Sequence, residues 1–396
     1  MITFDEAFKE VLRHPLELGV ETIPLAHGMK RILAEDILAD RDFPPFDRAT
    51  KDGIAISYSA IENGLKTFKI EGVLSAGMPQ KTLTIDTNCL EIMTGAVLPK
   101  KADTVIMYEE VTLIDGIASI ETTPKKRQNI HAKGSDEKKG TVLLNAGIRI
   151  DTAEIGILAS VGKTEVVVKK IPKITVISTG NELVEVAETP LPHQIRKSNT
   201  ISLAAALSKE GIGSQLVHFA DTKKEIEQSL GKALQANDVL LLSGGVSKGK
   251  FDFIPEVMET LGVKKIFHRV AQRPGKPFWF GVHLDMRTLI FSFPGNPVST
   301  FANYHIYFLP WLYKTWGLPY EEKVVILQEE IRVKLPLTRF VLVKTYDQDG
   351  CLKAQIIGGN GSGDLISLAK SDGFVCLRPR EESYKKGEMV PFISTR

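Results

Sequence analysis

The sequence predicts a multidomain α/β protein: a central doubly wound α/β domain lies between a mostly β N-terminal half and a small C-terminal β domain. Three observations lead to this prediction. The chain has 396 residues, more than the roughly 250 to 300 at which one hydrophobic core stops growing. From Ile174, apolar runs of strand length alternate with amphipathic helical stretches, as in a sheet covered on both faces. On either side of this region, short β-branched runs lie between Gly and Pro.

The N-terminal half begins with one amphipathic helix. Residues 2–14, "ITFDEAFKEVLRH", have acids in the first turn and apolar residues at helical spacing, namely Phe4, Phe8, Val11 and Leu12. The stretch has no apolar h-region, so it is not read as a signal peptide. Between about residues 40 and 170 we expect strands in "TFKIEGVL", "DTVIMYEEVTLI" and "TEVVVKKIPK".

The central domain is expected to alternate strands with helices. The strand candidates are "ITVIS", "SQLVHFAD", "DVLLLSGG", "VKKIFHRV" and "TLIFSFPG"; the helix candidates are "SNTISLAAALSKEG", "TKKEIEQSLGKALQA", "FIPEVMETLG" and one long helix in "NPVSTFANYHIYFLPWLYKTWG". After Pro319, short strands with turn signals such as "DQDG" and "GGNGSG" predict the small β domain.

Composition excludes several classes of protein. The 50 basic and 48 acidic residues give a net charge of +2, so bulk attraction to nucleic acid is not implied. No run approaches the roughly 18 apolar residues of a membrane span. The three cysteines, Cys89, Cys351 and Cys376, form no metal-ligand spacing or disulfide framework. A cytoplasmic setting is therefore expected.

The stretch "LLLSGGVSKGKFDF" nearly matches a phosphate-binding P-loop. It places Gly244, Gly245 and Gly249 after a strand, where ligands bind in open α/β sheets. Phe251 stands where a P-loop needs Ser or Thr. Asp252, one position later, is either a ligand for a hard cation or the N-cap of a helix.

Carboxylates follow two further strands of the same sheet. Glu182 lies in "STGNELV" and Asp221 in "FADTKKEI". A surface glutamate and a helix N-cap are the alternative interpretations. With Asp252, three strand ends offer a carboxylate.

Two more stretches suit an anionic ligand. "RVAQRPGKPFWFG" brings Arg273 and Lys276 together around a Pro-Gly turn, unless this is only a solvated basic turn. "FSFPGNPVSTF" opens a helix near Asn296 or Pro297, and helix N-termini attract anions.

Polar loops of the N-terminal half have a weaker pattern. They are "PPFDRATKDGIAI" with Asp47, Arg48, Lys51 and Asp52, "EIMTGAVLPKKADTVIMYEE" with Thr94, and "NIHAKGSDEKKG" with His131, Lys133 and Asp136. Each by itself is read as a loop with polar residues.

In this order, the segments resemble the MoeA-type molybdopterin molybdenumtransferases, the family that includes the gephyrin E domain. The resemblance rests on "PPFDRATKDGIAI", "IMTGAVLPKKADTVIMYEE", "QNIHAKGSD", "STGNELV", "SNTISLAAAL", "SGGVSKGKFDF", "RPGKPFWFG", "FPGNPVSTF" and "GSGDLISLAKSDGFVCL". It covers nearly the whole chain, although each piece is short.

The resemblance implies insertion of molybdate into adenylylated molybdopterin, with release of AMP and with Mg²⁺. It also implies a homodimer with the active site at the subunit interface, and contact with the adenylyltransferase and with molybdoenzyme apoproteins. The implied regions are a discontinuous domain I (1–42 and 141–172), an inserted β domain II (43–140), an α/β domain III that binds molybdopterin (173–319) and a β domain IV (320–396).

The resemblance also assigns roles to residues. Catalytic positions would be Asp52, Thr94, Glu182 and Asp252, with Asp52 and Thr94 supplied by the partner subunit. Glu182, Asp221 and Asp252 would hold the metal. The substrate-binding set would be Ser198, Asn199, Asp221, Ser243, Gly244, Gly245, Ser247, Arg273, Lys276, Pro294 and His131.

Some positions depart from the family pattern. Arg48 and Lys51 stand where Asn and Met are usual, His131 where Arg is usual, and Arg273 where Lys is usual. If position 131 grips molybdate, the charge of histidine makes that grip pH-dependent near neutrality.

Three alternatives stay open at this point. One is the related adenylyltransferase, although about 170 residues precede Ile174 here. The others are a gephyrin-like scaffold without catalysis, and a P-loop NTPase, which lacks the Ser or Thr after its lysine.

Overall fold

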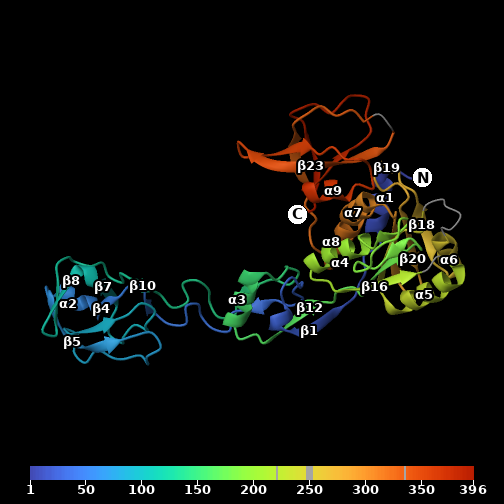
Figure 1. Cartoon of the computed structure of the whole chain (residues 1–396). Coiled ribbons are helices and arrows are strands. Elements are labelled where there is room, and N and C mark those ends of the chain that lie inside the picture. Colours follow the sequence, from blue (N-terminus) through green and yellow to red (C-terminus); the bar gives the residue numbers. More distant parts are fainter. Residues whose placement is uncertain (220–221, 247–252, 334–335) are drawn as a thin grey trace. The chain divides into compact units, whose positions relative to one another are not determined.

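The computed structural model describes residues 1–219, 222–246, 253–333 and 336–396 (Figure 1). Three predicted site residues, Asp221, Ser247 and Asp252, lie outside the described residues. The chain forms two compact units. The larger unit contains Met1–Ala34, Gly147–Ile150 and Val167–Arg396, and the smaller unit contains Glu35–Ala146 and Asp151–Val166.

The larger unit is built on a six-stranded sheet with the order β16-β13-β17-β21-β20-β18. Its strands are β13 (Ile174–Thr179), β16 (Ser214–Phe219), β17 (Val239–Ser243), β18 (Lys264–His268), β20 (Trp279–His283) and β21 (Thr288–Phe293). The first four strands in this order are parallel, and β20 is antiparallel to both of its neighbours, β21 and β18. Ser178 pairs with Ser243, and Ser243 pairs with Phe293, so β13, β17 and β21 end at one edge.

Strand β17 shows why this sheet is covered on both faces. All of its residues are buried, and all but Ser243 are apolar. Val239 and Leu241 pack into the core that also holds residues of α1 (Phe4–Leu12), α4 (Asn199–Lys209) and α8 (Leu309–Trp316). Leu240 and Leu242 pack into a second core with α5 (Lys223–Ala236) and α6 (Ile254–Thr260), which lie together in Figure 1. Alternate side chains of a strand point to opposite faces, so a continuous apolar run fills both cores.

The predicted N-terminal helix is α1. Thr3 caps it: its hydroxyl accepts the Glu6 N–H at 3.2 Å, and the Glu6 carboxylate accepts the Thr3 N–H at 2.8 Å. Phe4, Ala7 and Val11 are buried against the sheet domain. The capping box and the apolar stripe thus fix both the start and the orientation of this helix.

The long helix expected after residue 296 is not uniform. It consists of α7 (Pro297–Asn303), a π-helical turn η3 (Tyr304–Phe308) and α8. Pro310 lies at the start of α8 and has no N–H to donate to the carbonyl four residues earlier. The wider turn ends at Phe308, two residues before this proline. Such π-helical turns are rare in proteins, and those that occur are often found at functional sites.

The C-terminal part of the larger unit is a small closed β barrel. It contains β22 (Lys323–Leu327), β23 (Thr338–Gln348), β24 (Cys351–Ile356), β25 (Gly373–Leu377) and β26 (Met389–Ser394), and closes through pairing of β23 with β25. β19 (Gln272–Arg273) adds to β23 in parallel. Helix α9 (Leu365–Lys370) follows the "GSGD" turn, and Asp364 caps it.

Short ribbons pair β1 (Val20–Pro24) with β12 (Glu165–Lys169) and β14 (Leu183–Val184) with β15 (Ile195–Arg196).

The smaller unit has its own six-stranded sheet with the order β7-β4-β6-β5-β9-β8. The strands are β4 (Gly53–Ile56), β5 (Thr67–Leu74), β6 (Cys89–Ile92), β7 (Thr104–Met107), β8 (Val111–Ile114) and β9 (Ile117–Ile120). The β-rich run "DTVIMYEEVTLI" contains both β7 and β8, which the 3₁₀ turn Tyr108–Glu110 separates. The ribbons β3 (Arg48–Ala49) with β10 (Ile130–His131) and β2 (Ile37–Leu38) with β11 (Val142–Leu144), and the helices α2 (Tyr58–Glu62) and α3 (Thr152–Ser160), complete the unit.

Candidate functional site

A cavity of about 770 Å³ lies in the larger unit at the carboxyl ends of its parallel strands. The loops after β13, β17 and β21 line it, with Glu182, Gly244 and Pro294 among their residues. β16 and β17 lie on opposite sides of β13, so the chain reverses its winding direction at this point. Ligands of open α/β sheets bind at such a switch point.

The two glycines of the loop after β17 are required by close packing. Gly244 and Gly245 have positive φ angles of +103° and +71°. A Cβ on Gly245 would lie 2.6 Å from Ile254 Cγ1, and one on Gly244 would lie 3.1 Å from the Thr179 carbonyl oxygen. The backbone of this loop therefore reaches the cavity without side chains, as contact with an oxyanion requires.

Glu182 is placed by the glycine two residues before it. Gly180 has a φ angle of +132°, and a Cβ there would lie 2.5 Å from Glu182 Oε2. The carboxylate therefore folds back over its own turn while the residue stays exposed at the cavity. It is a hard oxygen donor available to a cation.

Arg273 and Lys276 line the cavity from the turn between β19 and β20. Arg273 is exposed and Lys276 is half-buried. Across residues 1–219, 222–246, 253–333 and 336–396, neither side chain forms an ion pair. Both positive charges are therefore available to an anionic ligand.

Polar side chains form the floor of the cavity. Asn199 Nδ2 donates to Ser243 Oγ at 2.9 Å and to the Gly295 carbonyl at 2.6 Å. Thr300 Oγ1 donates to the Pro294 carbonyl at 2.5 Å. Ser243 and Thr300 are almost fully buried, so these bonds fix the loop after β21 against the loop after β17.

The cation expected from the sequence has one described ligand in the cavity. Glu182 lines it, whereas Asp221 and Asp252 are outside the described residues. Over the rest of the chain, no three His, Cys, Asp or Glu side chains gather as a metal site.

The smaller unit joins two of the predicted site residues, Asp52 and Thr94. Asp52 Oδ1 accepts the Thr94 N–H at 2.6 Å and the Thr94 hydroxyl at 2.7 Å. The Thr94 hydroxyl, followed by its N–H, holds the pKa of Asp52 below its usual range. Asp52 is thus an exposed carboxylate that stays ionised.

His131 lies between a cation and an anion in the smaller unit. It pairs with Arg48 across the β3–β10 ribbon. Its Nδ1 lies 3.2 Å from Arg48 Nη2, and its Nε2 lies 2.7 Å from Asp136 Oδ1. A guanidinium can only donate, so Nδ1 accepts and Nε2 carries the proton that it donates to Asp136. Arg48, His131 and Asp136 thus form a chain of polar contacts across the ribbon.

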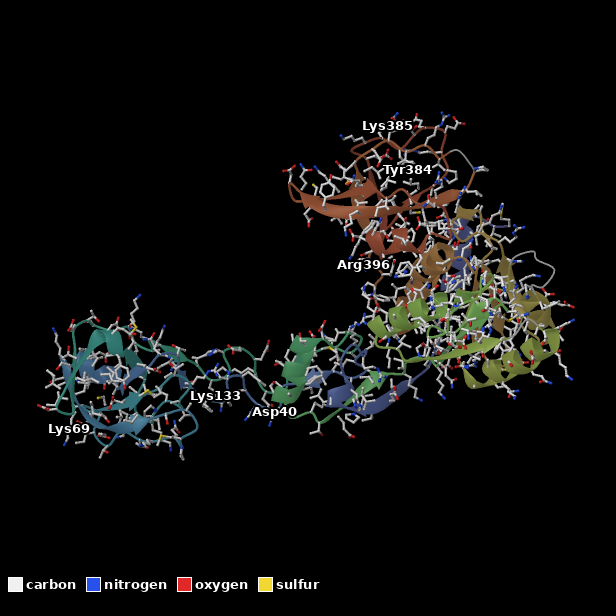
Figure 2. The ribbon with its side chains drawn as sticks, in the orientation of Figure 1. Asp40, Lys69, Lys133, Tyr384, Lys385 and Arg396 are labelled. Carbon is white, nitrogen blue, oxygen red and sulfur yellow. The ribbon has the colours of Figure 1, made fainter. Side chains whose placement is uncertain are left out.

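The loop after His131 is tied to the loop that contains Arg48. The N–H of Lys133 donates to Asp47 Oδ1 at 2.6 Å, and Arg127 lies 3.3 Å from the other oxygen of Asp47. Figure 2 labels Lys133, which lies where the chain leaves this sheet toward α3. His131 also lowers the pKa of Asp136 through its hydrogen bond. Asp47, Arg48, His131 and Asp136 thus form one polar cluster.

Comparisons with known proteins agree along the whole chain. Three family models match: "MoeA N-terminal region (domain I and II)" over residues 2–162, "Probable molybdopterin binding domain" over 175–314 and "MoeA C-terminal region (domain IV)" over 324–395. A Synechocystis sp. protein named molybdopterin molybdenumtransferase is 40% identical over 399 residues, and all of both chains is covered. The chain belongs to the molybdopterin molybdenumtransferase family.

Other members of the molybdopterin molybdenumtransferase family support this assignment. The Bacillus subtilis protein of that name is 31% identical, with 100% of this chain and 94% of the relative covered. A crystal structure of a molybdopterin biosynthesis MoeA protein from Pyrococcus horikosii aligns with a TM-score of 0.82 and 31% identity, covering 100% and 99% of the two chains. The predicted fold class is therefore confirmed. No helix within the described part of the chain is both long and apolar enough to cross a membrane.

The cavity of this molybdopterin molybdenumtransferase family member gathers most of the residues predicted for it. They are Glu182, Ser198, Asn199, Ser243, Gly244, Gly245, Arg273, Lys276 and Pro294. Asp52, Thr94 and His131 belong to the smaller unit. Sequence reasoning missed Thr179, Arg196, Lys197, Gln272 and Ser362, which also line the cavity. Arg196 and Lys197 directly precede the predicted Ser198, and their adjacent charges were the available signal.

Proposed function

We propose that this chain inserts molybdenum from molybdate into adenylylated molybdopterin and releases AMP. Membership of the molybdopterin molybdenumtransferase family supports the transferase activity. In this reaction the phosphoanhydride between the molybdopterin phosphate and AMP is hydrolysed: water supplies an oxygen to one phosphorus, AMP leaves on the other side of the broken P–O bond, and molybdate is taken up by the pterin. Both substrates are anions, so the site must offset their mutual repulsion.

The observation that carries the proposal is the cavity at the strand switch point. Gly244 and Gly245 bring backbone without side chains to its wall, and Arg273 and Lys276 present charges that no described side chain neutralises. Backbone donors and fixed cations together stabilise charge that develops on a phosphate oxygen. Ser198 and Asn199 lie beside them, where a nucleotide extending from the phosphates would contact them.

We further propose that Mg²⁺ binds through Glu182, with Asp252 and Asp221 as the additional ligands expected from the sequence. When bound, the ion would neutralise phosphate oxygens and assist departure of AMP. The chain's own part is to present these carboxylates beside the glycine loop. Glu182 is the described member of this set, and its exposure in the cavity supports the assignment.

The test is AMP release from adenylylated molybdopterin by the purified full chain. We expect release that requires both molybdate and Mg²⁺, and an Asp252→Ala variant that releases less than a tenth as much. Release without molybdate would contradict the transfer of molybdenum. Release with chelator present would contradict the role of Mg²⁺.

The alternative functions are less favoured. The relatives matched over the full chain are named molybdopterin molybdenumtransferase, so an adenylyltransferase is not favoured. Net adenylylation of molybdopterin by ATP in the absence of molybdate would reverse this order. Intact cofactor formation in cells by Asp252→Ala would favour a scaffold.

We also propose a homodimer in which Asp52, Thr94 and His131 act in the active site of a second copy of the chain. Asp52, Thr94 and His131 lie in stretches that resemble functional motifs of the family, but they belong to the smaller unit. The cavity belongs to the larger unit. Mixing an Asp52→Ala protein with a Lys276→Met protein tests the idea. We expect partial recovery of activity after subunit exchange; no recovery, despite mixed dimers, would place all these residues in sites of a single subunit.

A further inference from the structure

The turn that carries Arg273 and Lys276 is backed by three buried polar side chains. Gln272, Asn303 and Tyr307 each have no exposed surface. Gln272 belongs to β19, directly before the turn, whereas Asn303 ends α7 and Tyr307 lies in the π-helical turn η3. We call these three residues the polar trio.

The polar trio is joined to the turn by hydrogen bonds from both sides. Gln272 Nε2 donates to Asn303 Oδ1 at 2.9 Å and to the Pro274 carbonyl at 3.0 Å. Asn303 Nδ2 donates to the Gly275 carbonyl at 3.3 Å. Two consecutive carbonyls of the turn therefore have partners on rigid elements.

Tyr307 completes the network from below. Its hydroxyl donates to Gln272 Oε1, which leaves the Gln272 amide nitrogen to face the turn. Its ring packs against Phe278 with a centroid separation of 4.7 Å. Burial raises the pKa of the Tyr307 hydroxyl well above its ordinary value, so the group remains a donor.

The fit between the trio and the turn leaves no room for a side chain at position 275. Gly275 has a φ angle of +87°, and a Cβ at this position would lie 2.3 Å from Asn303 Oδ1 and 2.8 Å from Gln272 Nε2. The backbone of Gln272 and Arg273 also pairs with Thr338 and Arg339 of β23. A buried network with every described member bonded has one favourable arrangement, because each broken bond leaves an unpaired polar group.

We propose that the polar trio is a positioning device, which holds Arg273 and Lys276 in the one geometry that binds a pyrophosphate-type anion. Gln272 lines the cavity, but its side chain is fully buried and bonded to Asn303, Pro274 and Tyr307, so the trio acts through the backbone of the turn. This inference rests on the proposed function only in requiring that the cavity accept such an anion. Preorganised cations bind more tightly because less ordering accompanies binding.

The test compares two tyrosines of the same π-helical turn. Tyr307→Phe removes a hydroxyl that holds Gln272, whereas Tyr304→Phe removes a buried hydroxyl that has no hydrogen-bond partner among the described residues. Inorganic pyrophosphate is the probe, and calorimetry on the full chain gives its affinity. We expect Tyr307→Phe to bind about 3- to 10-fold more weakly and Tyr304→Phe to bind like the native protein.

A double-mutant cycle separates positioning from a general loss of stability. Tyr307→Phe is also made in a Lys276→Met background, and thermal unfolding confirms that each variant is folded. If the trio acts through the turn, the effect of Tyr307→Phe shrinks by at least about twofold once Lys276 is gone.

Three results would overturn the inference: additive effects in the cycle, equal affinity of Tyr307→Phe and the native protein, or no pyrophosphate binding by the native protein. The proposed function is judged separately. Native pyrophosphate binding without molybdate-dependent AMP release would count against that function and leave the positioning role standing.

Discussion

The two units of this molecule hold predicted site residues in opposite ways. In the larger unit, neutral side chains that are fully buried fix the turn of Arg273 and Lys276. In the smaller unit, the Asp52–Thr94 pair and the Arg48–His131–Asp136 cluster include charged groups that are largely exposed.

The two kinds of contact differ in how strongly they stabilise the fold and in whether they depend on pH. Removing one partner of a buried neutral hydrogen bond lowers the free energy of unfolding, because the other partner is left unpaired. Such bonds between neutral groups do not depend on pH. Exposed charged contacts contribute little to the free energy of unfolding, because water and salt screen them. The turn of Arg273 and Lys276 in the larger unit should therefore respond to changes in side-chain size. The exposed charged contacts of the smaller unit should respond to pH.

The largest effect is expected from Gly275→Ala. The new methyl group meets Asn303 Oδ1 in a backbone conformation that L-residues rarely adopt, so we expect a loss of about 2–4 kcal/mol in the free energy of unfolding. Gly19→Ala is the matched control, since Gly19 has a φ angle of +77° and open space around it. Chemical denaturation measures both. Similar losses in the two variants would mean that the polar trio is not tightly packed against the turn.

Removal of one cavity cation should weaken binding without unfolding the protein. Charge-assisted contacts contribute about 1.5–3 kcal/mol each, so Lys276→Met should bind pyrophosphate roughly 10- to 100-fold more weakly. Lys197→Met is the control, because Lys197 also lines the cavity but its ammonium is paired with Glu185. An equal loss in both variants, measured by calorimetry, would show that unpaired charge is not what selects the ligand.

His131→Arg should change the pH dependence of molybdenum insertion. An arginine keeps its positive charge over the whole range, whereas the charge of a histidine side chain depends on pH near neutrality. If position 131 binds molybdate, the native apparent affinity for molybdate is several-fold higher at pH 6 than at pH 8, whereas His131→Arg shows little change. Rate measurements over this range decide the question, and identical profiles would remove His131 from the molybdate site.

The smallest effect is expected from Asp52→Asn. The folded-state pKa of Asp52 is lowered by the Thr94 donors, so the stabilisation is present above the ordinary aspartate value of about 3.9. It is lost as the pH falls through the lower folded-state pKa. The difference in thermal midpoint between native and variant, about one degree at pH 7, should vanish toward pH 3.

Tyr307→Phe is the reference for this pH series. Its difference from the native protein should stay constant between pH 3 and pH 7, since its pKa lies far above that range. If the thermal-midpoint difference of Tyr307→Phe changed with pH in the same way as that of Asp52→Asn, the two units would not differ in the pH dependence of their contacts.

The cavity could be predicted because its loops follow strands that are buried on both faces. The run "DVLLLSGG" identifies a central strand, and parallel neighbours bring the ends of β13, β17 and β21 to one edge. This rule predicts that Glu182 lies near Gly244, whereas Arg273 and Lys276 are placed in the same site by the family resemblance. Gln272, Asn303 and Thr300 could not be found in this way, because a polar residue within an apolar stretch has no spacing rule that names its distant partner.

The sequence by itself determined the class of each element, the family and the loops that face an anion. Those properties depend on local patterns: apolar periodicity, glycine at turns and charge beside proline. Only the tertiary structure decided that α7 and the π-helical turn supply Asn303 and Tyr307 to a turn about 30 residues earlier, and that Arg48, His131 and Asp136 meet at the β3–β10 ribbon. The physical reason is that a hydrogen bond between distant residues depends on the direction of each donor and acceptor, which packing alone fixes.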